Sequence, residues 1–282
     1  MLHALAFNIH GWKGMDRRFD VERLARIIAG AATDATALDV VVLDVVALNE
    51  VYHPFVQPDA AQPLLARLAA RLGMNFVFAP TLPPGPFDDP QTAFGNAILS
   101  PHPILAFAGH RLTTPAGHPA RVLLEARLLL PDRRSLTVYA THLDHQSEAV
   151  RMGQVQALLL WAGRDRGRSH LLLGDLNSLA PADYVGQEEA VAHLQADAIA
   201  AHLVRDGMQV LPRLLKAGYH DCFARAGQGT GLTYGTAQEK IRIDYCLAAG
   251  PLADQVTACR RLDDDDVRLA SDHFPLLTEF AW

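Results

Sequence analysis

Short apolar runs alternate with amphipathic helical patterns along the whole chain, and this alternation limits the possible folds more than any other feature. Runs rich in Val, Leu and Ile have the length and composition of buried strands, at residues 2–7, 41–48, 76–79, 96–99, 122–130, 135–140, 170–173, 242–248 and 275–280. Helical patterns fill the gaps at residues 20–30, 62–72, 147–162 and 187–206. The sequence therefore predicts an α/β protein, with a single domain over residues 1–282.

The connections between the runs indicate mixed sheets. The tetrapeptide PDRR joins the runs at 122–130 and 135–140 and predicts an antiparallel hairpin, so a purely parallel sheet is disfavoured. Residues 80–92 and 225–237 are rich in Pro, Gly and Thr and have the character of loops. Because strand patterns continue on both sides of these loops, neither is expected to separate domains.

Net charge disfavours a protein that grips nucleic acid along its backbone. The formal charge is −6, whereas such proteins usually carry a basic surface that neutralises phosphates. Small basic clusters occur only at residues 17–18, 133–134, 164–168 and 260–261, and solvated surface charge is the simplest explanation of each.

The cysteines and the hydropathy pattern predict a soluble cytoplasmic protein. Cys222, Cys246 and Cys259 are odd in number and form neither a CxxC pair nor a zinc pattern. The chain starts on an apolar run without a basic leader, and no uncharged apolar stretch reaches the length of a transmembrane helix.

Polar side chains recur at the ends of the predicted strands, and this recurrence is the main indication of a functional site. They are Asn8 and His10 in LAFNIHG, Asn49 and Glu50 in VVALNEV, His142 in LTVYATHLDH, Asp175 and Asn177 in LLLGDLNS, Asp244 in IRIDYCL, and Asp272 and His273 in LASDHFPLL. One such residue taken alone is most simply a cap or a turn. Several of them are expected to converge, because strand ends on one sheet edge lie close together and form the sites of α/β folds.

The residue types at these strand ends suit one chemistry. Carboxylates without paired cysteines favour Mg²⁺ or Mn²⁺ over zinc, and a divalent cation would offset their mutual repulsion. Histidines can protonate or hydrogen-bond a phosphoryl oxygen, and amides can orient ligands or water. The sequence has neither an activated nucleophile pattern nor a phosphate-binding glycine loop. Attack of water on phosphorus, assisted by a metal, fits this set of groups.

Seven sequence blocks in order resemble the endonuclease/exonuclease/phosphatase superfamily, which includes deoxyribonucleases, abasic endonucleases, sphingomyelinases and inositol polyphosphate phosphatases. The blocks are FNIHG, ALNEV, GNAILS, THLDH, GDLNS, RIDYCLA and SDHFPLL, and the resemblance extends from residue 5 to residue 277. It implies a four-layer αββα sandwich, in which two mixed β-sheets pack face to face, helices lie outside, and the site lies at one end.

The resemblance divides the matching residues between cation binding and catalysis. It implies that Glu50, Asn8 and Asp272 bind Mg²⁺ or Mn²⁺. The catalytic roles concern the attacking water and the phosphate: Asp175 activates the water, Asn177 helps to hold the phosphate, His273 and His142 contact it, and Asp244 orients His273.

Some positions depart from parts of the family. His10 stands where abasic endonucleases tend to have a metal-binding aspartate, which argues against a second metal. Those enzymes also lack a histidine at the position of His142, so their branch is disfavoured. Asn49 replaces the more usual glutamine and is expected to do similar polar work. Asn96 and His10 are candidate substrate contacts, although Asn96 could equally be a strand-edge amide.

The predicted function is hydrolysis of a phosphodiester by a metal-dependent phosphoesterase. The phosphoester could be nucleic acid, lipid or a small molecule, and the acidic balance fits a small molecule without difficulty. A phosphomonoesterase of the same fold and a non-catalytic binding protein are the alternatives. No stable protein partner is inferred.

Overall fold

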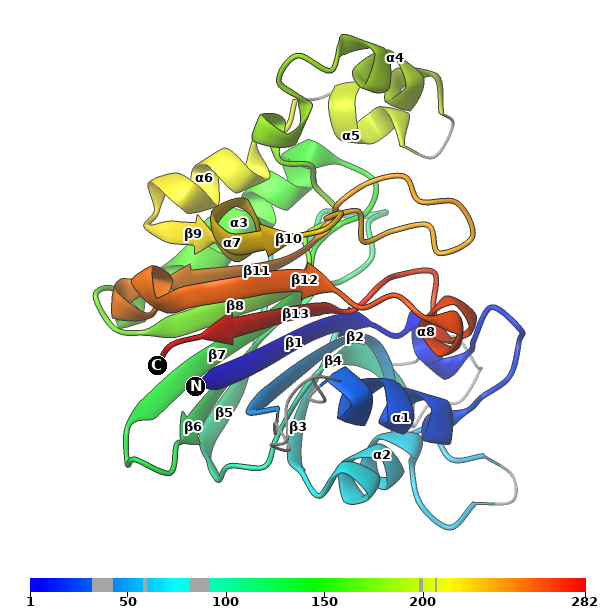
Figure 1. Ribbon diagram of the computed structural model, residues 1–282, viewed down its shortest axis with the longest axis vertical. Coiled ribbons are helices and arrows are strands. Elements are labelled where there is room, and N and C mark those ends of the chain that lie inside the picture. The colour runs from blue at the N-terminus through cyan, green and yellow to red at the C-terminus, as the bar shows by residue number, and fades with distance from the viewer. Residues whose placement is uncertain (32–42, 58–59, 82–91, 198–199, 206) are drawn as a thin grey trace.

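Two β-sheets pack face to face with helices on their outer faces, so the molecule has four layers (Figure 1). The structure is a computed structural model that describes residues 1–31, 43–57, 60–81, 92–197, 200–205 and 207–282. The two chain ends lie beside each other in Figure 1. This arrangement confirms the predicted αββα sandwich of two mixed sheets.

The first sheet has seven strands in the order β10-β12-β13-β1-β2-β4-β3. Their bounds are β1 Leu2–Asn8, β2 Val45–His53, β3 Asn75–Pro80, β4 Ala93–Ser100, β10 Gly227–Gln228, β12 Val256–Arg261 and β13 Leu276–Phe280. The parallel pair β1 and β2 lies at its centre, and most other pairs are antiparallel.

The second sheet has six strands in the order β5-β6-β7-β8-β11-β9. Their bounds are β5 Ile104–Arg111, β6 Val122–Leu129, β7 Ser135–His142, β8 His170–Asp175, β9 Tyr219–Asp221 and β11 Asp244–Ala249. β7 and β8 are parallel, and β6 and β7 form the predicted antiparallel hairpin.

Helices cover both outer faces. The α-helices are α1 Val21–Ala31, α2 Leu64–Leu72, α3 Glu148–Ala162, α4 Glu188–Ala196, α5 Ala201–Arg205, α6 Val210–Lys216, α7 Cys222–Ala226 and α8 Asp265–Ala270, and the 3₁₀ turns are η1 His10–Trp12, η2 Gly163–Asp165, η3 Pro181–Tyr184 and η4 Gly250–Gln255. Helices α1 and α2 lie against the first sheet and α3 and α6 against the second, while α4 and α5 project beyond α3 (Figure 1). No helix within the described ranges is both long and apolar enough to span a membrane.

Alternation of side chains along the strands produces the layered core. In β2, Val45 and Ala47 face the space between the sheets, whereas Val46 and Leu48 face the helices. Strands buried on both faces read as continuous apolar runs, which is why the sequence located them. The local end signals are also observed: the Ser147 hydroxyl accepts a hydrogen bond from the Val150 amide at the start of α3, and Gly73 ends α2 in the left-handed conformation.

Four strands escaped the sequence patterns. β5 is an edge strand with mostly exposed side chains, β9 has only three residues, and β12 ends in two arginines. The fourth is β10, a two-residue strand within the segment 225–237 that was expected to be a loop. The single helix expected over 187–206 is two helices: α4 ends at Ala196, the extended Asp197 follows it, and Asp197 Oδ1 accepts a hydrogen bond from the Ala200 amide just before α5. Residues 198–199 and 206 of this expected helix lie outside the described residues. Helices α6, α7 and α8 were not expected, and the end of α7 overlaps the expected loop 225–237. Residues 41–42, and 82–91 of the predicted loop 80–92, lie outside the described residues.

Candidate active site

The strand register brings the predicted site residues to one edge of the sandwich. Asn8 pairs in register with Asn49 where β1 and β2 run in parallel, and His142 pairs with Asp175 where β7 and β8 run in parallel. The antiparallel β11 adds Asp244 opposite Asp175. β1, β7 and β8 end at this edge with Asn8, His142 and Asp175, and β11 begins there with Asp244. β2 was expected to end at Asn49 and Glu50, but it continues past them to His53.

A β-bulge in β2 directs Glu50 toward the pocket. Leu48 pairs with Ala97 and Val51 pairs with Gly95, so two residues of β2, Asn49 and Glu50, stand opposite one residue of β4. Glu50 has a φ of 57° and lines the pocket, whereas Val51 resumes packing against the helices. Bulges of this kind re-aim a side chain next to an active site, and here the re-aimed group is the predicted metal ligand.

Asn49 connects the two sheets directly beneath the site. Its Oδ1 accepts a hydrogen bond of 3.0 Å from the Asp175 amide, and its Nδ2 donates to Asn96 Oδ1 at 2.8 Å and to the Thr141 carbonyl at 3.0 Å. Asn49 is fully buried. The bonds fix the backbone of Asp175, so Asn49 does its polar work from behind the site.

Gly174 makes this close approach possible. Its φ is 132°, and a Cβ atom there would lie 2.1 Å from the Thr141 carbonyl oxygen and 2.8 Å from Asn49 Oδ1. Only glycine tolerates both the conformation and the contact. The glycine of the GDLNS block is therefore a packing requirement of the site.

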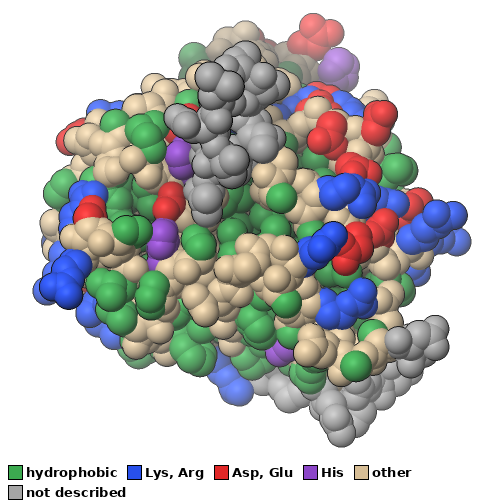
Figure 2. All heavy atoms as spheres, turned by 60° about the horizontal axis from the view of Figure 1, so that its bottom comes forward, with side chains coloured by type: hydrophobic (Ala, Val, Ile, Leu, Met, Phe, Trp, Pro, Cys, Tyr) green, Lys and Arg blue, Asp and Glu red, His purple; other side chains and the backbone are tan. Residues whose placement is uncertain are grey.

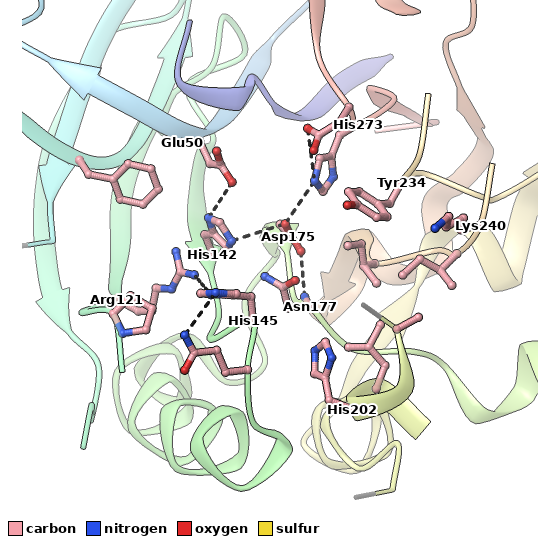
Figure 3. Close-up of a pocket in the computed structure, with 18 of the residues that line it drawn as sticks. Glu50, Arg121, His142, His145, Asp175, Asn177, His202, Tyr234, Lys240 and His273 are labelled. Carbon is pink, nitrogen blue, oxygen red and sulfur yellow. Dashed lines mark hydrogen bonds and ion pairs between the residues drawn. The ribbon is translucent and has the colours of Figure 1, made fainter. Parts of the chain in front are cut away.

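Asp175 lies at the centre of the convergent side chains. Its Oδ2 accepts a hydrogen bond of 3.2 Å from Asn8 Nδ2 and lies 3.5 Å from His142 Nε2 and 3.8 Å from His273 Nε2. Its Oδ1 accepts from the Asn177 amide at 2.8 Å. Figure 3 shows His142 and His273 pointing toward Asp175 from two sides.

His273 is held by Asp244. Its Nδ1 lies 2.8 Å from Asp244 Oδ2, which leaves Nε2 directed toward Asp175 and Asp272. Burial opposes the charged imidazolium, but the charge and hydrogen bond of Asp244, together with Asp175 and Asp272, outweigh burial and raise the pKa of His273 to about 10. His273 is therefore a cation at neutral pH.

The pKa values of Asp175 and His142 are also displaced from their ordinary values, in opposite directions. Burial, followed by repulsion from Asp244, raises the pKa of Asp175 to about 7 against the attraction of His273. Burial and the nearby Arg121 lower the pKa of His142 well below its ordinary value, so this imidazole is neutral. His142 Nδ1 has no hydrogen-bond partner among the described residues and lies 4.0 Å from Glu50 Oε1. His142 Nδ1 is thus a buried ring nitrogen, unpartnered within the described ranges, on the side of Glu50.

Arg121 is a site residue that the sequence analysis missed. It immediately precedes β6, is only 5% exposed, and lines the pocket beside His142. Its Nη2 donates to His145 Nδ1 at 3.2 Å, while its Nε has no partner within the described part of the chain (Figure 3). The available signal was an arginine at the start of a strand whose neighbour ends in His142. A buried guanidinium with a free donor suits a phosphate oxygen.

The donor set fits a hard divalent cation. Glu50, Asp175 and Asp272 place three carboxylates on one pocket wall, and the Asn8 amide hydrogen-bonds Glu50 Oε1 at 3.1 Å. Carboxylate and amide oxygens are the ligands that Mg²⁺ and Mn²⁺ prefer, and a cation would offset this concentration of negative charge. Donor atoms of Asp175, Asp244 and His273 also lie within 4.8 Å of one another, but His273 Nδ1 is already bonded to Asp244. This cluster is therefore partly engaged in its own hydrogen bond, and Glu50 and Asp272 stay the predicted ligands.

Two predicted substrate contacts lie behind or beside the pocket. Asn96 is 2% exposed, accepts from Asn49 and donates to the Val122 carbonyl at 2.9 Å, and it does not line the pocket. His10 hydrogen-bonds the Lys13 carbonyl through Nδ1 in the turn after β1 and is likewise outside the lining. Asn177 does line the pocket, and its Nδ2 donates to the Leu143 carbonyl.

The central residues open into a cavity of about 890 Å³. Glu50, His142, Asp175 and His273 occupy one side of it in Figure 3, and Arg121 with His145, Tyr234 with Lys240, and His202 of α5 surround the rest. Such a volume is typical of small-molecule pockets.

Comparisons with known proteins place this geometry in context. The model of the Endonuclease/Exonuclease/phosphatase family matches residues 5–273. A search of curated protein sequences gave no significant match.

Solved structures share the fold at low sequence identity. An endonuclease/exonuclease/phosphatase from Beutenbergia cavernae has a TM-score of 0.73 and 24% identity over 98% of this chain and 70% of its own. A Neisseria 3′ phosphatase bound to a product DNA hairpin has a TM-score of 0.67 and 18% identity, with 100% of both chains covered. A mannosyl-6-phosphatase from Bacteroides thetaiotaomicron has a TM-score of 0.66 and 15% identity, also with 100% of both chains covered.

Proposed function

The chain belongs to the endonuclease/exonuclease/phosphatase family, and on that premise we propose that it is a metal-dependent phosphoesterase in which water attacks phosphorus. One observation carries the proposal: Asp175 Oδ2 lies within 4 Å of Asn8, His142 and His273, at the wall of a cavity that Glu50 and Arg121 also line. These groups can bind a phosphoryl group and deprotonate a water molecule beside it.

Asp175 acts as the general base in this proposal. A base works best when its pKa is near the operating pH, and the pKa of about 7 that burial and Asp244 produce meets that condition. A cation bound at Glu50 would lower this pKa by favouring the carboxylate, so Asp175 would be ready to accept a proton at neutral pH. Its hydrogen bonds to Asn8 and Asn177 fix its orientation.

The imidazoles and Arg121 stabilise the charge that develops on the phosphoryl oxygens. His273 is charged and fixed by Asp244, so its Nε2–H can donate to an equatorial oxygen. His142 is neutral and can donate one N–H, whereas Arg121 offers its free Nε–H. Because these groups are buried, their charge and hydrogen bonds act in a medium of low dielectric constant.

Glu50, Asn8 and Asp272 would hold Mg²⁺ or Mn²⁺. When bound, the ion supplies positive charge to a phosphoryl oxygen and to the leaving oxygen. The single Glu50 carboxylate on the β2 bulge, with a histidine rather than a carboxylate at position 10, favours one metal.

The proposed substrate is a phosphodiester, as the resemblance suggests, and a phosphomonoester is the alternative. The fold neighbours include a protein named as an AP endonuclease, from Archaeoglobus fulgidus, and one named as a mannosyl-6-phosphatase, and both names are compatible with an ester substrate on this fold. Arg121 and the charged His273 favour the monoester, because a phosphomonoester dianion is attracted more strongly by two cations than a phosphodiester monoanion is.

The reaction can be tested with bis(4-nitrophenyl) phosphate and 4-nitrophenyl phosphate in Mg²⁺, in Mn²⁺ and in a chelator. Asp175→Asn and His273→Ala should each lower turnover by about 10²-fold or more, since a general acid or base contributes about 10²–10⁴-fold. Asp132→Asn, at an exposed turn, is the matched control and should match wild type. Wild-type turnover in both site variants would refute the assignment. Absence of metal-dependent turnover of any ester would favour the binding-protein alternative.

We further propose that residues 1–282 form one domain and that the protein is cytoplasmic. Both sheets share one inter-sheet core, which supports a single unit. Cys222, Cys246 and Cys259 are buried free thiols, which suits a reducing compartment.

A further inference from the structure

We infer that the substrate is a compact phosphoester whose alcohol group is apolar or aromatic, and that duplex nucleic acid is not the substrate. This inference rests on the proposed function and concerns the part of the cavity beyond the phosphate-binding groups. Apolar side chains line that part on two opposite sides.

One apolar wall comes from the sandwich itself. Tyr52 and Phe94 lie next to Glu50 and His142, with their ring centroids 5.2 Å apart, and Pro119 and Ala120 extend this wall toward Arg121. The phenyl ring of Phe94 lies 6.2 Å from the imidazole of His142. A group attached to a phosphate at His142 would therefore lie against hydrocarbon.

The opposite wall comes from α5 and the segment before β11. Leu203 of α5 lines the cavity together with Ile241 and Ile243, and Tyr234 lies beside His273, with its ring centroid 5.0 Å from the imidazole. These residues belong to a small separate core that also includes Leu179 and Leu194. The wall is thus anchored by packing of its own, and Figure 3 shows His202 on the same helix facing the cavity.

The charge distribution disfavours a polyanion. Four carboxylates line the cavity, namely Glu50, Asp175, Asp197 and Asp272, and Lys240 is already paired with Asp197 at 3.1 Å. A cation at Glu50 and Asp272 would neutralise the phosphate end only. Arg121 would be occupied by the first phosphate, so the permanently charged cations among the described residues that line the cavity leave only Lys240, paired with Asp197, for a second one, beside the imidazoles of His145 and His202.

The surface outside the cavity gives the same indication. Three of the four basic clusters of the sequence contain an arginine paired with a carboxylate: Arg134 with Asp132, Arg164 with Glu125, and Arg261 with Asp263. Figure 2 shows basic and acidic side chains intermixed over the right of its face. Proteins that bind duplex DNA commonly present a continuous basic surface, because release of counterions drives much of the binding.

Binding of phosphonates tests the inference without requiring turnover. Phenylphosphonate and methylphosphonate carry the same anionic head, so the ratio of their affinities in Mg²⁺, measured by calorimetry, reports the apolar walls. We expect phenylphosphonate to bind at least about tenfold more tightly, because a buried ring removes roughly 100 Å² of apolar surface from water. A ratio near one, or no binding of either ligand, would overturn the inference.

Two variants assign the preference to this cavity. Leu203→Ala should lower the ratio of phenylphosphonate to methylphosphonate affinity severalfold, because it removes apolar contact area on the α5 side. Ala120→Trp should lower the same ratio by filling the space from the opposite side. The matched control is Leu215→Ala at an exposed position of α6, which should keep the wild-type ratio. If thermal melting shows that Leu203→Ala is unfolded, Ala120→Trp decides alone. An unchanged ratio in every folded cavity variant would overturn the inference.

Turnover separates this inference from the proposed function. With Mg²⁺, kcat/KM for an aryl phosphoester should exceed that for a duplex oligonucleotide, and faster cleavage of the duplex would overturn the inference while leaving the phosphoesterase intact. If no ester is hydrolysed, the proposed function fails, and the phosphonate ratio still supports or overturns the apolar pocket.

Discussion

Replacement of Asn49 by alanine should weaken both the fold and the reaction, although Asn49 does not line the cavity. The substitution removes the acceptor of the Asp175 amide and the donor of Asn96 Oδ1 and of the Thr141 carbonyl. All four residues are almost completely buried. The cost is therefore expected to be that of stranded polar groups and not that of a lost surface contact.

The magnitude follows from the number of groups left without a partner. A buried donor or acceptor that loses its hydrogen bond costs about 1–3 kcal/mol, so three such groups should lower the free energy of unfolding by about 3 kcal/mol or more. At about 2–4 °C per kcal/mol for a chain of this size, the Tm should fall by about 6 °C or more. Turnover should fall about tenfold or more, because the backbone of Asp175 loses the bond that fixes it.

Two matched variants make the experiment decisive. Asn75→Ala removes an exposed amide that bonds the Ser100 and His102 carbonyls, and it should leave both Tm and turnover close to wild type. Asn96→Ala removes the acceptor of Asn49 Nδ2 and the donor to the Val122 carbonyl but leaves the bond from Asn49 to Asp175, and it should lower Tm without raising KM. Thermal melting and steady-state kinetics provide the readouts. Asn49→Ala with wild-type Tm and turnover would refute the role of the bridge, and a raised KM in Asn96→Ala would instead make Asn96 a substrate contact.

Three further substitutions test separate parts of the site. Asp244→Asn removes the charge that holds the pKa of His273 near 10 against burial, so His273 should lose its proton at lower pH. The alkaline limb of the pH profile of turnover should therefore move to lower pH, and an unmoved limb would contradict the pairing. Arg121→Met should raise KM by about 10–100-fold, the equivalent of a charged hydrogen bond of about 1.5–3 kcal/mol. Arg121→Lys should recover part of the lost affinity, and equal kinetics in wild type and both variants would exclude contact between Arg121 and the phosphate. Gly174→Ala should lower Tm by several degrees and abolish turnover, because its Cβ would collide with the Thr141 carbonyl, and normal melting would show that the strand end can shift.

The strand ends were predictable because their signal is local. An apolar run that stops at Asn8, His142 or Asp175 identifies both the strand and the residue that emerges from it. Convergence at one edge then follows from parallel pairing, which the register of β1 with β2 and of β7 with β8 confirms. The fold class was predictable for the same reason, together with the order of the sequence blocks.

What the sequence could not provide depends on contacts between distant residues. The bond from Asn49 to the Asp175 amide joins residues 126 positions apart, and no local pattern distinguishes an asparagine that braces a site from one that contacts a ligand. For the same reason, the sequence analysis named Asn96 as a candidate substrate contact, whereas the structure shows it bonded to Asn49. Arg121 escaped because its importance depends on burial, and the wall formed by α5 escaped because a helical period predicts a helix but not the partner against which it packs.

Backbone strain at the site shows how stability and function are divided in this fold. Glu50 adopts a φ of 57°, a conformation that costs a residue without a small polar side chain about 1–3 kcal/mol, and it does so within the bulge that it forms with Asn49. An unbulged β2 would avoid that cost, but Glu50 would then point toward the helical layer that Val51 fills. Asn177 also has a positive φ, at a residue type that tolerates it better. The Asn49 hydrogen bonds lie at the same bulge and offset part of this cost, and the residue that bears the strain is the one whose carboxylate is proposed to bind the cation.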